Sequence, residues 1–455
     1  MQSNRQADNR PMRRLGPRPL PLHLSLALAS WSNSALILPG FNLVWQNLKE
    51  QEAQSGRPDR AASANHPPLP IPPSLKEMLA ELGPQLDAAD PAALAQALTE
   101  EGHRRLDAFL TGVLAYRRTD SSPTERTRAV LWSEGSTRLL DYRRKTASAE
   151  NRIAPRVLVV PSLVNRYQIL DLDPSISFLD YLAEAGFHPF VVDWDAPGSL
   201  ERDFTLSDYI AGRLCRALDI VRQQEGGPII VIGYCMGGLL ALAASQLYRA
   251  GNDPAAKDLA GLALLATPWD FHAEAVGHAR MVAALGRQLE PALQILDELP
   301  VDLLQVFFAL LDPFLVTRKF QNFAALDRQD PTGSAAAGRF VALEDWLNDG
   351  VPLVTRVASE CLINWYGDNT TMRGGWRVAG TAIDPKQLSI PCLAMVPSSD
   401  RIVPPGSALA LGRLLPNCRI ETPAAGHIGM MVGARAKTAI WPQIASWMRD
   451  VAGGP

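Results

Sequence analysis

The stretch "IIVIGYCMGGLLALAAS", residues 229–245, decides the fold of this chain. It opens with apolar, β-branched residues that are typical of a strand buried on both faces, and it closes with Ala- and Leu-rich sequence that favours a helix. Cys235 stands in the turn between them, with Gly233 two positions before it and Gly237 two positions after it. A sharp strand-to-helix turn needs these glycines, because a Cβ there would collide with neighbouring backbone. We therefore predict a nucleophile elbow that presents Cys235.

Strands and helices alternate on both sides of this elbow. Short apolar runs such as "RVLVVPS" (156–162), "HPFVVDW" (188–194) and "IPCLAMV" (390–396) are separated by helical sequence. Such alternation predicts an α/β domain over residues 151–455, with a mostly parallel central sheet and helices on both faces. The sequence between about 272 and 385 is helical and aromatic-rich and breaks the alternation, so we predict a cap inserted over the active face.

The N-terminal third has a different character. We predict an N-terminal segment with a Pro- and Ala-rich linker over residues 1–74, and a helical region with a short strand pair over residues 75–150. The arginine-led apolar run at 13–41 is loosely similar to a signal peptide, but serine, asparagine and histidine interrupt it. It is too polar to span a bilayer, and an amphipathic segment that docks on this protein, on a partner or on a lipid surface fits better.

The composition narrows the class of protein. Of 455 residues, 47% are hydrophobic and 20% are charged, as in an ordinary globular chain. The net charge of −3 gives no support for a nucleic-acid partner. The five cysteines form no CxxC pair and are odd in number, so we expect no zinc site and no disulfide framework, and a reducing cytoplasm fits best. No metal or redox cofactor is indicated.

The partners of a nucleophile on such an elbow follow in the order acid, then histidine, each just past a later strand. "LAMVPSSDRIVPP" (393–405) places Asp400 in this way, and "IETPAAGHIGMM" (420–431) places His427. We predict that His427 takes the proton from Cys235 and that Asp400 orients and charges the imidazole.

The oxyanion that forms during acyl transfer needs backbone N–H donors. Met236, at the start of the helix after the elbow, and Val164, in the loop after the first strand, are the predicted donors. Other polar residues at strand ends are candidates for lining the substrate site, with turn or packing roles as the alternative: Asn165, Asp171, Trp194 and Asp270. The tryptophans of the cap (Trp346, Trp365 and Trp376) fit the core better than a ligand platform.

These motifs resemble one family as a set. "GYCMGG" (233–238), "LVNRYQILDL" (163–172), "LLATPWDF" (264–271), "SSDRIVP" (398–404) and "GHIGMM" (426–431) resemble the polyhydroxyalkanoate (PHA) synthases, which are α/β-hydrolase-fold acyltransferases with a cysteine nucleophile. The likeness covers residues from about 150 to 450.

The resemblance implies that Cys235 carries the acyl group, that Asp400 and His427 assist it, and that Val164 and Met236 donate to the oxyanion. It implies a 3-hydroxyacyl-coenzyme A (CoA) substrate, CoA as leaving group, a growing polyester chain as acceptor and no separate cofactor. It also implies a cytoplasmic protein at a PHA granule surface, acting as a homodimer or with a second synthase subunit.

Two other functions remain open at the level of sequence. A hydrolase on the same scaffold, either an acyl-CoA thioesterase or an intracellular PHA depolymerase, uses the same triad and oxyanion donors. A non-catalytic granule-associated protein is the third hypothesis, although an idle site has no need of these residues in this order.

Overall fold

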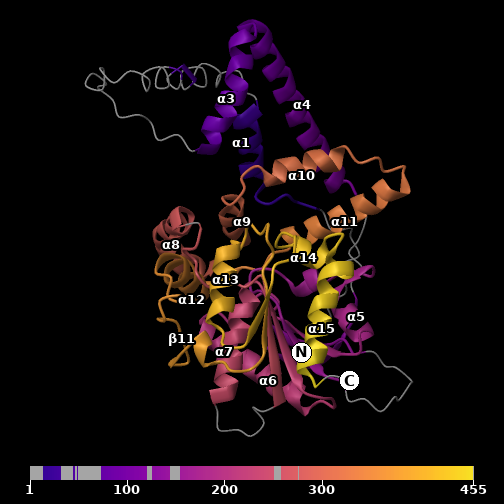
Figure 1. Ribbon diagram of the computed structural model, residues 1–455, viewed down its shortest axis with the longest axis vertical. Coiled ribbons are helices and arrows are strands. Elements are labelled where there is room, and N and C mark those ends of the chain that lie inside the picture. The colour runs from indigo at the N-terminus through magenta and orange to yellow at the C-terminus, as the bar shows by residue number, and fades with distance from the viewer. Residues whose placement is uncertain are drawn as a thin grey trace, which may run out of the picture. The chain divides into compact units, whose positions relative to one another are not determined.

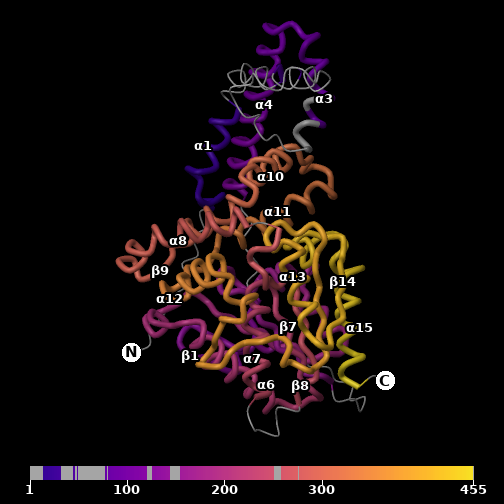
Figure 2. The backbone as a smooth tube through the Cα atoms, turned by 60° about the vertical axis from the view of Figure 1, so that its left-hand side comes forward, coloured from indigo at the N-terminus to yellow at the C-terminus, as the bar shows by residue number. Residues whose placement is uncertain are grey.

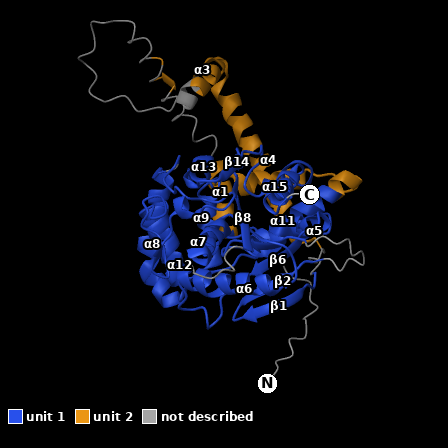
Figure 3. Cartoon of the chain, turned by 60° about the horizontal axis from the view of Figure 1, so that its bottom comes forward, with its two compact units in different colours: residues 1–19, 120–312, 335–455 blue, residues 20–119, 313–334 orange. Residues whose placement is uncertain are grey.

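A computed structural model of the chain describes residues 14–31, 45, 46, 49, 73–119, 126–143, 154–250, 258–274 and 276–453 (Figure 1). Its contacts divide the chain into two compact units (Figure 3). Unit 1 comprises Met1–Pro19, Asp120–Asp312 and Ala335–Pro455, and unit 2 comprises Leu20–Thr119 and Pro313–Ser334.

Unit 1 is built on one eight-stranded sheet. Its strands are, from one edge to the other, β1 (Ala129–Glu134), β2 (Thr137–Asp141), β6 (His188–Asp193), β3 (Arg156–Val160), β7 (Ile229–Tyr234), β8 (Leu259–Leu265), β13 (Cys392–Met395) and β14 (Cys418–Glu421). From β6 to β14 all neighbouring strands are parallel. The carboxyl ends of these strands therefore meet at one edge of the sheet, where a site can be assembled from their loops.

Helices cover both faces of the sheet. One apolar cluster joins α6 (Cys215–Gln223), α7 (Met236–Ala250) and α13 (Pro405–Leu414) to one face of the strands. The other cluster joins α5 (Phe178–Glu184) and α15 (Trp441–Val451) to the opposite face. The central strands β3 and β7 are buried along their whole length, which explains why their sequences are continuously apolar. The predicted fold class is confirmed.

The predicted strand pair forms, but it belongs to the main sheet. β1 and β2 make an antiparallel hairpin, and β2 pairs antiparallel with β6. The placement of this pair with the N-terminal helices was therefore wrong. The physical reason is that a two-stranded hairpin is marginal alone and gains its stability by pairing with the exposed edge of a larger sheet.

Most of the chain between β8 and β13 is helical, as predicted for the cap. In unit 1 it includes α8 (Val276–Leu296), α9 (Val301–Ala309), α12 (Thr355–Ser359) and the π-helix η5 (Glu360–Gly367). The short strands β9 (Glu298–Leu299) and β10 (Leu353–Val354) pair with each other, and β11 (Arg377–Val378) pairs with β12 (Thr381–Ala382). Figure 2 shows α8, β9 and α12 together. The helix α11 (Pro331–Asn348) begins in unit 2 and ends in unit 1.

Unit 2 is a helical assembly of α1 (Leu20–Trp31), α3 (Pro73–Ala88), α4 (Pro91–Arg117) and α10 (Leu315–Ala324). Asp90 caps the N-terminus of α4, and its side chain accepts the amides of Ala92 and Ala93. Phe320 of α10 packs edge-on against Phe109 and Tyr116 of α4. Part of the sequence predicted as cap thus groups with the N-terminal helices.

The described part of the N-terminal apolar run forms α1, which packs against α4 and buries His23 and Ala27. Residues 32–41 of that run lie outside the described residues. Within the described ranges, no helix combines the length and the apolar character needed to span a membrane.

Candidate active site

The backbone at Cys235 is in the left-handed region, with φ of 56°. Its amide donates to the carbonyl of Leu265 on β8 (2.8 Å), which ties the turn to the neighbouring strand. A Cβ on Gly237 would meet the carbonyl oxygens of Val160 and Pro161, and a Cβ on Gly233 would meet the backbone of Gly238. The two elbow glycines therefore occupy positions where no side chain fits, and the turn projects Cys235 above the carboxyl end of β7.

Asp400 and His427 follow β13 and β14 and form a buried pair. The Nδ1 of His427 donates to one carboxylate oxygen of Asp400 over 2.7 Å. The other oxygen accepts the amides of Ile402 (2.8 Å) and Val403 (2.9 Å), which holds the carboxylate in place. The side chain of His427 also hydrogen-bonds the sulfur of Cys235. The structure thus brings the three predicted catalytic residues together from three strand ends.

The charge state of His427 is set by opposing effects. Burial alone lowers the pKa of the imidazole, but the negative charge of the Cys235 sulfur and the hydrogen bonds to Asp400 and Cys235 raise it to about 10. Tyr234 packs beside the ring, with centroids 5.2 Å apart, and its hydroxyl donates to the carbonyl of His427 (3.2 Å). The arrangement therefore favours a protonated imidazole.

The other four cysteines are in surroundings that suppress their reactivity. Burial raises the pKa of the Cys215 and Cys418 thiols to about 11, and it raises the pKa of Cys361 and Cys392 further. A thiol that stays protonated at neutral pH is a poor nucleophile. Cys235 is the cysteine that combines an elbow with a histidine partner.

The two predicted oxyanion donors lie in the same cavity wall as Cys235. Met236 is the first residue of α7, where an amide has no partner within the helix. The amide of Val164 donates to the hydroxyl of Ser162 over 3.3 Å, a long bond, and its carbonyl accepts the amide of Val351 (3.1 Å). The elbow and the loop after β3 therefore face each other across Cys235.

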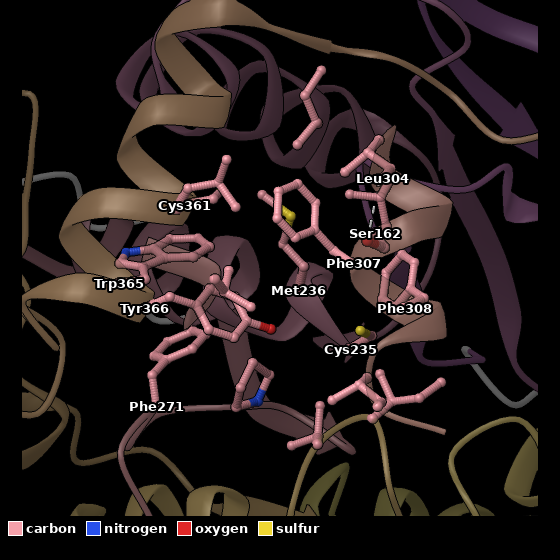
Figure 4. Close-up of a pocket in the computed structure, with 18 of the residues that line it drawn as sticks. Ser162, Cys235, Met236, Phe271, Leu304, Phe307, Phe308, Cys361, Trp365 and Tyr366 are labelled. Atoms are coloured by element: carbon pink, nitrogen blue, oxygen red, sulfur yellow. Dashed lines mark hydrogen bonds between the residues drawn. The ribbon is translucent and has the colours of Figure 1, made fainter. Parts of the chain in front are cut away.

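The cavity above Cys235 has a volume of about 110 Å³ and is mostly apolar (Figure 4). Aromatic rings form much of its wall: Phe271, Phe307, Phe308, Trp365 and Tyr366. Trp365 is buried, as expected, yet one side of its ring borders the cavity. The phenylalanines at 307 and 308 come from the cap helix α9, and Trp365 and Tyr366 come from η5.

The four residues predicted to line the substrate site do not line this cavity. Asp171 is buried and accepts hydrogen bonds from the hydroxyl of Tyr142 (2.7 Å) and from Arg126 (2.9 Å). Trp194 donates its indole N–H to the carbonyl of Pro161 (3.0 Å). The polar groups of both side chains are hydrogen-bonded to partners in unit 1. Both side chains therefore stabilise the loop after β3 and do not face the cavity.

Asn165 and Asp270 also take part in contacts that join loops of the protein. Asn165 forms an isolated antiparallel bridge with Gly350 through the backbone. One carboxylate oxygen of Asp270 accepts the amide of His272 (2.9 Å) and the side-chain amide of Asn369 (2.8 Å). Asp270 thereby fastens the loop after β8 to the segment that follows η5.

Several cap residues that line the cavity were not predicted from the sequence, among them His278, Phe307, Phe308 and Tyr366. The aromatic-rich sequence of the cap was the available signal, but an apolar helix carries no mark that separates the face packed in the core from the face bordering a cavity. Of the described residues, no cluster of three or more His, Cys, Asp or Glu side chains is suited to hold a metal ion.

The sequence model of the alpha/beta hydrolase fold matches residues 155–434. The chain belongs to the alpha/beta hydrolase fold family. Within this hydrolase-fold family the elbow, the acid after a later strand and the final histidine occupy the order seen here.

The chain is also distantly homologous to poly(3-hydroxyalkanoate) polymerase subunits PhaC. It is 28% identical to that of Haloferax mediterranei over 70% of this chain and 63% of the relative, so it spans less than two thirds of that protein. It is 28% identical to that of Synechocystis over 66% of this chain and 79% of the relative. A carboxyl esterase structure from Bacillus coagulans is 16% identical, with a TM-score of 0.46 over 72% of this chain and 98% of the esterase.

Proposed function

We propose that this protein is a PHA synthase-like acyltransferase that polymerises 3-hydroxyacyl groups from 3-hydroxyacyl-CoA. The observation that carries the proposal is Cys235 on the elbow, hydrogen-bonded to the buried His427–Asp400 pair at the wall of an apolar cavity. The distant homology to PhaC polymerase subunits supports the same chemistry.

Before acylation the proton of Cys235 passes to His427, and the deprotonated sulfur attacks the thioester carbonyl carbon. The charge that develops on the carbonyl oxygen is stabilised by the amide of Met236 and by that of Val164, whose long bond to Ser162 gives way. CoA leaves as its thiol with the proton from His427, and the acyl group remains on Cys235. One thioester replaces another, so the acyl group keeps its activation, which a serine ester would lose.

In the transfer step the hydroxyl of a hydroxyacyl chain attacks the Cys235 thioester. His427 accepts the hydroxyl proton, an ester bond forms, and the Cys235 thiolate leaves and is protonated again. Asp400 holds the imidazole in the orientation that both steps need.

The character of the cavity favours a chain hydroxyl over water as acceptor. Its wall is formed largely by aliphatic and aromatic side chains, such as Leu304, Phe307 and Leu353. Water gains few hydrogen bonds in such surroundings, whereas a hydroxyacyl chain buries apolar surface there. This observation favours the transferase over a thioesterase or a depolymerase with the same triad.

The partners follow from the same proposal. The protein takes a 3-hydroxyacyl-CoA and a growing polyester, acts in the cytoplasm at a granule surface, and works as a homodimer or with a second synthase subunit. The name "polymerase subunit" of the PhaC relatives supports the last point.

The proposal is tested by incubating the purified protein with 3-hydroxybutyryl-CoA and 3-hydroxyoctanoyl-CoA while measuring free thiol and identifying the acyl product. We expect thiol release with polyester as product, and a loss of at least about a thousandfold in Cys235→Ala. Cys215→Ala is the matched control, because that thiol lies on α6 outside the cavity. Thiol release with free hydroxy acid as the sole product would identify a hydrolase, and absence of release would contradict an acyl-transfer function.

A further inference from the structure

Tyr366 is held rigidly in the wall opposite the elbow. Its ring packs edge-on against Phe271, with centroids 4.9 Å apart at 63°, and Phe271 stacks on Trp365. Its backbone carbonyl is hydrogen-bonded to Nε2 of His272 over 2.9 Å. It lies on the π-helix η5, a conformation often found at functional sites. The ring position is therefore determined by its packing before any substrate binds.

The hydroxyl of Tyr366 points into the cavity on the side of Cys235 (Figure 4). Among the described residues it has no hydrogen-bond partner. Burial, and next the charge on Cys235, raise the pKa of this phenol, so the group remains a neutral hydroxyl that can donate one hydrogen bond and accept others.

Two polar groups beside Cys235 have another partner or another task. The hydroxyl of Ser162 accepts the amide of Val164, and the amide of Met236, at the start of α7, is the proposed oxyanion donor. A hydroxyl group that enters an apolar cavity loses its hydrogen bonds to water and must find a partner inside. In a 3-hydroxyacyl group this hydroxyl is two carbons from the carbonyl, within reach of a donor facing the elbow.

We propose that Tyr366 is a specificity-determining residue, whose hydroxyl binds the 3-hydroxyl of the acyl group and so selects hydroxyacyl thioesters over acyl thioesters without it. This inference rests on the proposed function. An acyl group that lacks the 3-hydroxyl leaves the phenol hydroxyl in the cavity unpaired, and sites built around such a hydrogen bond reject the analogue strongly.

The test compares CoA release in the first turnover from 3-hydroxyoctanoyl-CoA and from octanoyl-CoA. The first turnover reports acylation of Cys235 alone, so the missing acceptor hydroxyl of octanoyl-CoA does not affect it. We expect the wild type to favour the hydroxyacyl substrate, and we expect Tyr366→Phe to reduce that ratio by about ten- to a hundredfold. Tyr181→Phe is the control, since this tyrosine lies on α5 and does not line the cavity.

The ratio separates this role from a structural one. An equal loss of rate with both substrates would overturn the inference and assign Tyr366 to the oxyanion or to packing, which urea unfolding of Tyr366→Phe distinguishes. An unchanged ratio would also overturn it and leave His278, another polar side chain from the cap in this wall, as the candidate. Equal wild-type rates with both thioesters would refute the inference alone, whereas no release from either would refute the proposed function as well.

Discussion

At the scale of single residues, the position of Cys235 depends on backbone atoms that approach closely. Cys235 has a positive φ, and the two carbonyl groups nearest to Gly237 belong to the end of β3 and the loop that follows it. The loop that contains Val164, the second proposed oxyanion donor, is therefore packed directly against the elbow. A side chain at Gly237 would displace both the elbow and the loop after β3.

Gly237→Ala tests this contact. The added methyl group would meet the carbonyl oxygens of Val160 and Pro161, so we expect a loss of about 1–3 kcal/mol in the free energy of unfolding and a reduced rate of acylation. Urea unfolding and first-turnover thiol release measure the two effects. Gly212→Ala is the matched control, because a Cβ there meets nothing within 4 Å and alanine is the better helix former. A neutral Gly237→Ala would show that the elbow is looser than these contacts require.

The protonation of His427 is a second test at this scale. With a pKa of about 10, the imidazole stays protonated across neutral pH. Cys235→Ala removes the negative charge and the hydrogen bond that raise this pKa and leaves burial, which lowers it. We therefore expect the pKa of His427 to fall in Cys235→Ala, measured by NMR titration of the ring. His188, at the far end of β6, is the internal control; an unchanged His427 pKa would mean that the sulfur carries no charge.

At the scale of elements, the loop after β3 is fastened from several directions. The indole of Trp194 donates to the carbonyl of Pro161, and the indole of Trp346 donates to the carbonyl of Arg166 (2.7 Å). The amide of Val351 donates to the carbonyl of Val164. Backbone N–H donors stabilise an oxyanion only when they are already oriented. These contacts orient the loop without touching substrate.

Asp171→Asn tests the hydrogen bonds that Asp171 makes on the side of this loop away from the cavity. The carboxylate is 4% exposed and pairs with Arg126 and the hydroxyl of Tyr142, so we expect a loss of about 1.5–3 kcal/mol in the free energy of unfolding. Because the residue does not line the cavity, substrate selectivity should not change. Glu101→Gln is the control, since its ion pairs with Arg104 and Arg105 are exposed and contribute little to stability. Equal effects of the two variants would refute the assigned role.

At the scale of the whole molecule, residues that are distant in sequence are joined by an ion pair within unit 1. Arg14 holds Asp345 of α11 through two hydrogen bonds of 2.7 Å, across 331 positions, and the two side chains are only 8% and 13% exposed. Such a bidentate pair combines charge with fixed geometry. The segment before α1 thus belongs to the unit that contains the sheet.

Arg14→Gln tests how much this ion pair contributes to stability. Removal of the guanidinium breaks this largely buried bidentate pair, so we expect a loss of about 3 kcal/mol in the free energy of unfolding, measured in urea. Arg202→Gln is the control, because its pair with Asp297 is largely exposed. If both variants unfold at the same urea concentration, the N-terminal contact contributes nothing to the fold.

Local patterns in the sequence determined the parallel sheet, the elbow and the order of Cys235, Asp400 and His427. Each of these depends on a few adjacent residues: an apolar run, a glycine spacing, a polar residue just past a strand. Parallel strands carry their carboxyl ends to one edge, so the pattern along the chain is enough to predict that these three side chains meet.

Only the tertiary structure decided which cap residues border the cavity and which roles Asp171 and Asp270 have in fixing loops. It also decided that the hairpin of β1 and β2 extends the sheet and that α10 groups with the N-terminal helices. The physical reason is that these features depend on partners far apart in sequence. An apolar helix packs equally well on several surfaces, and a carboxylate at a strand end faces substrate or a neighbouring arginine according to what packing places beside it.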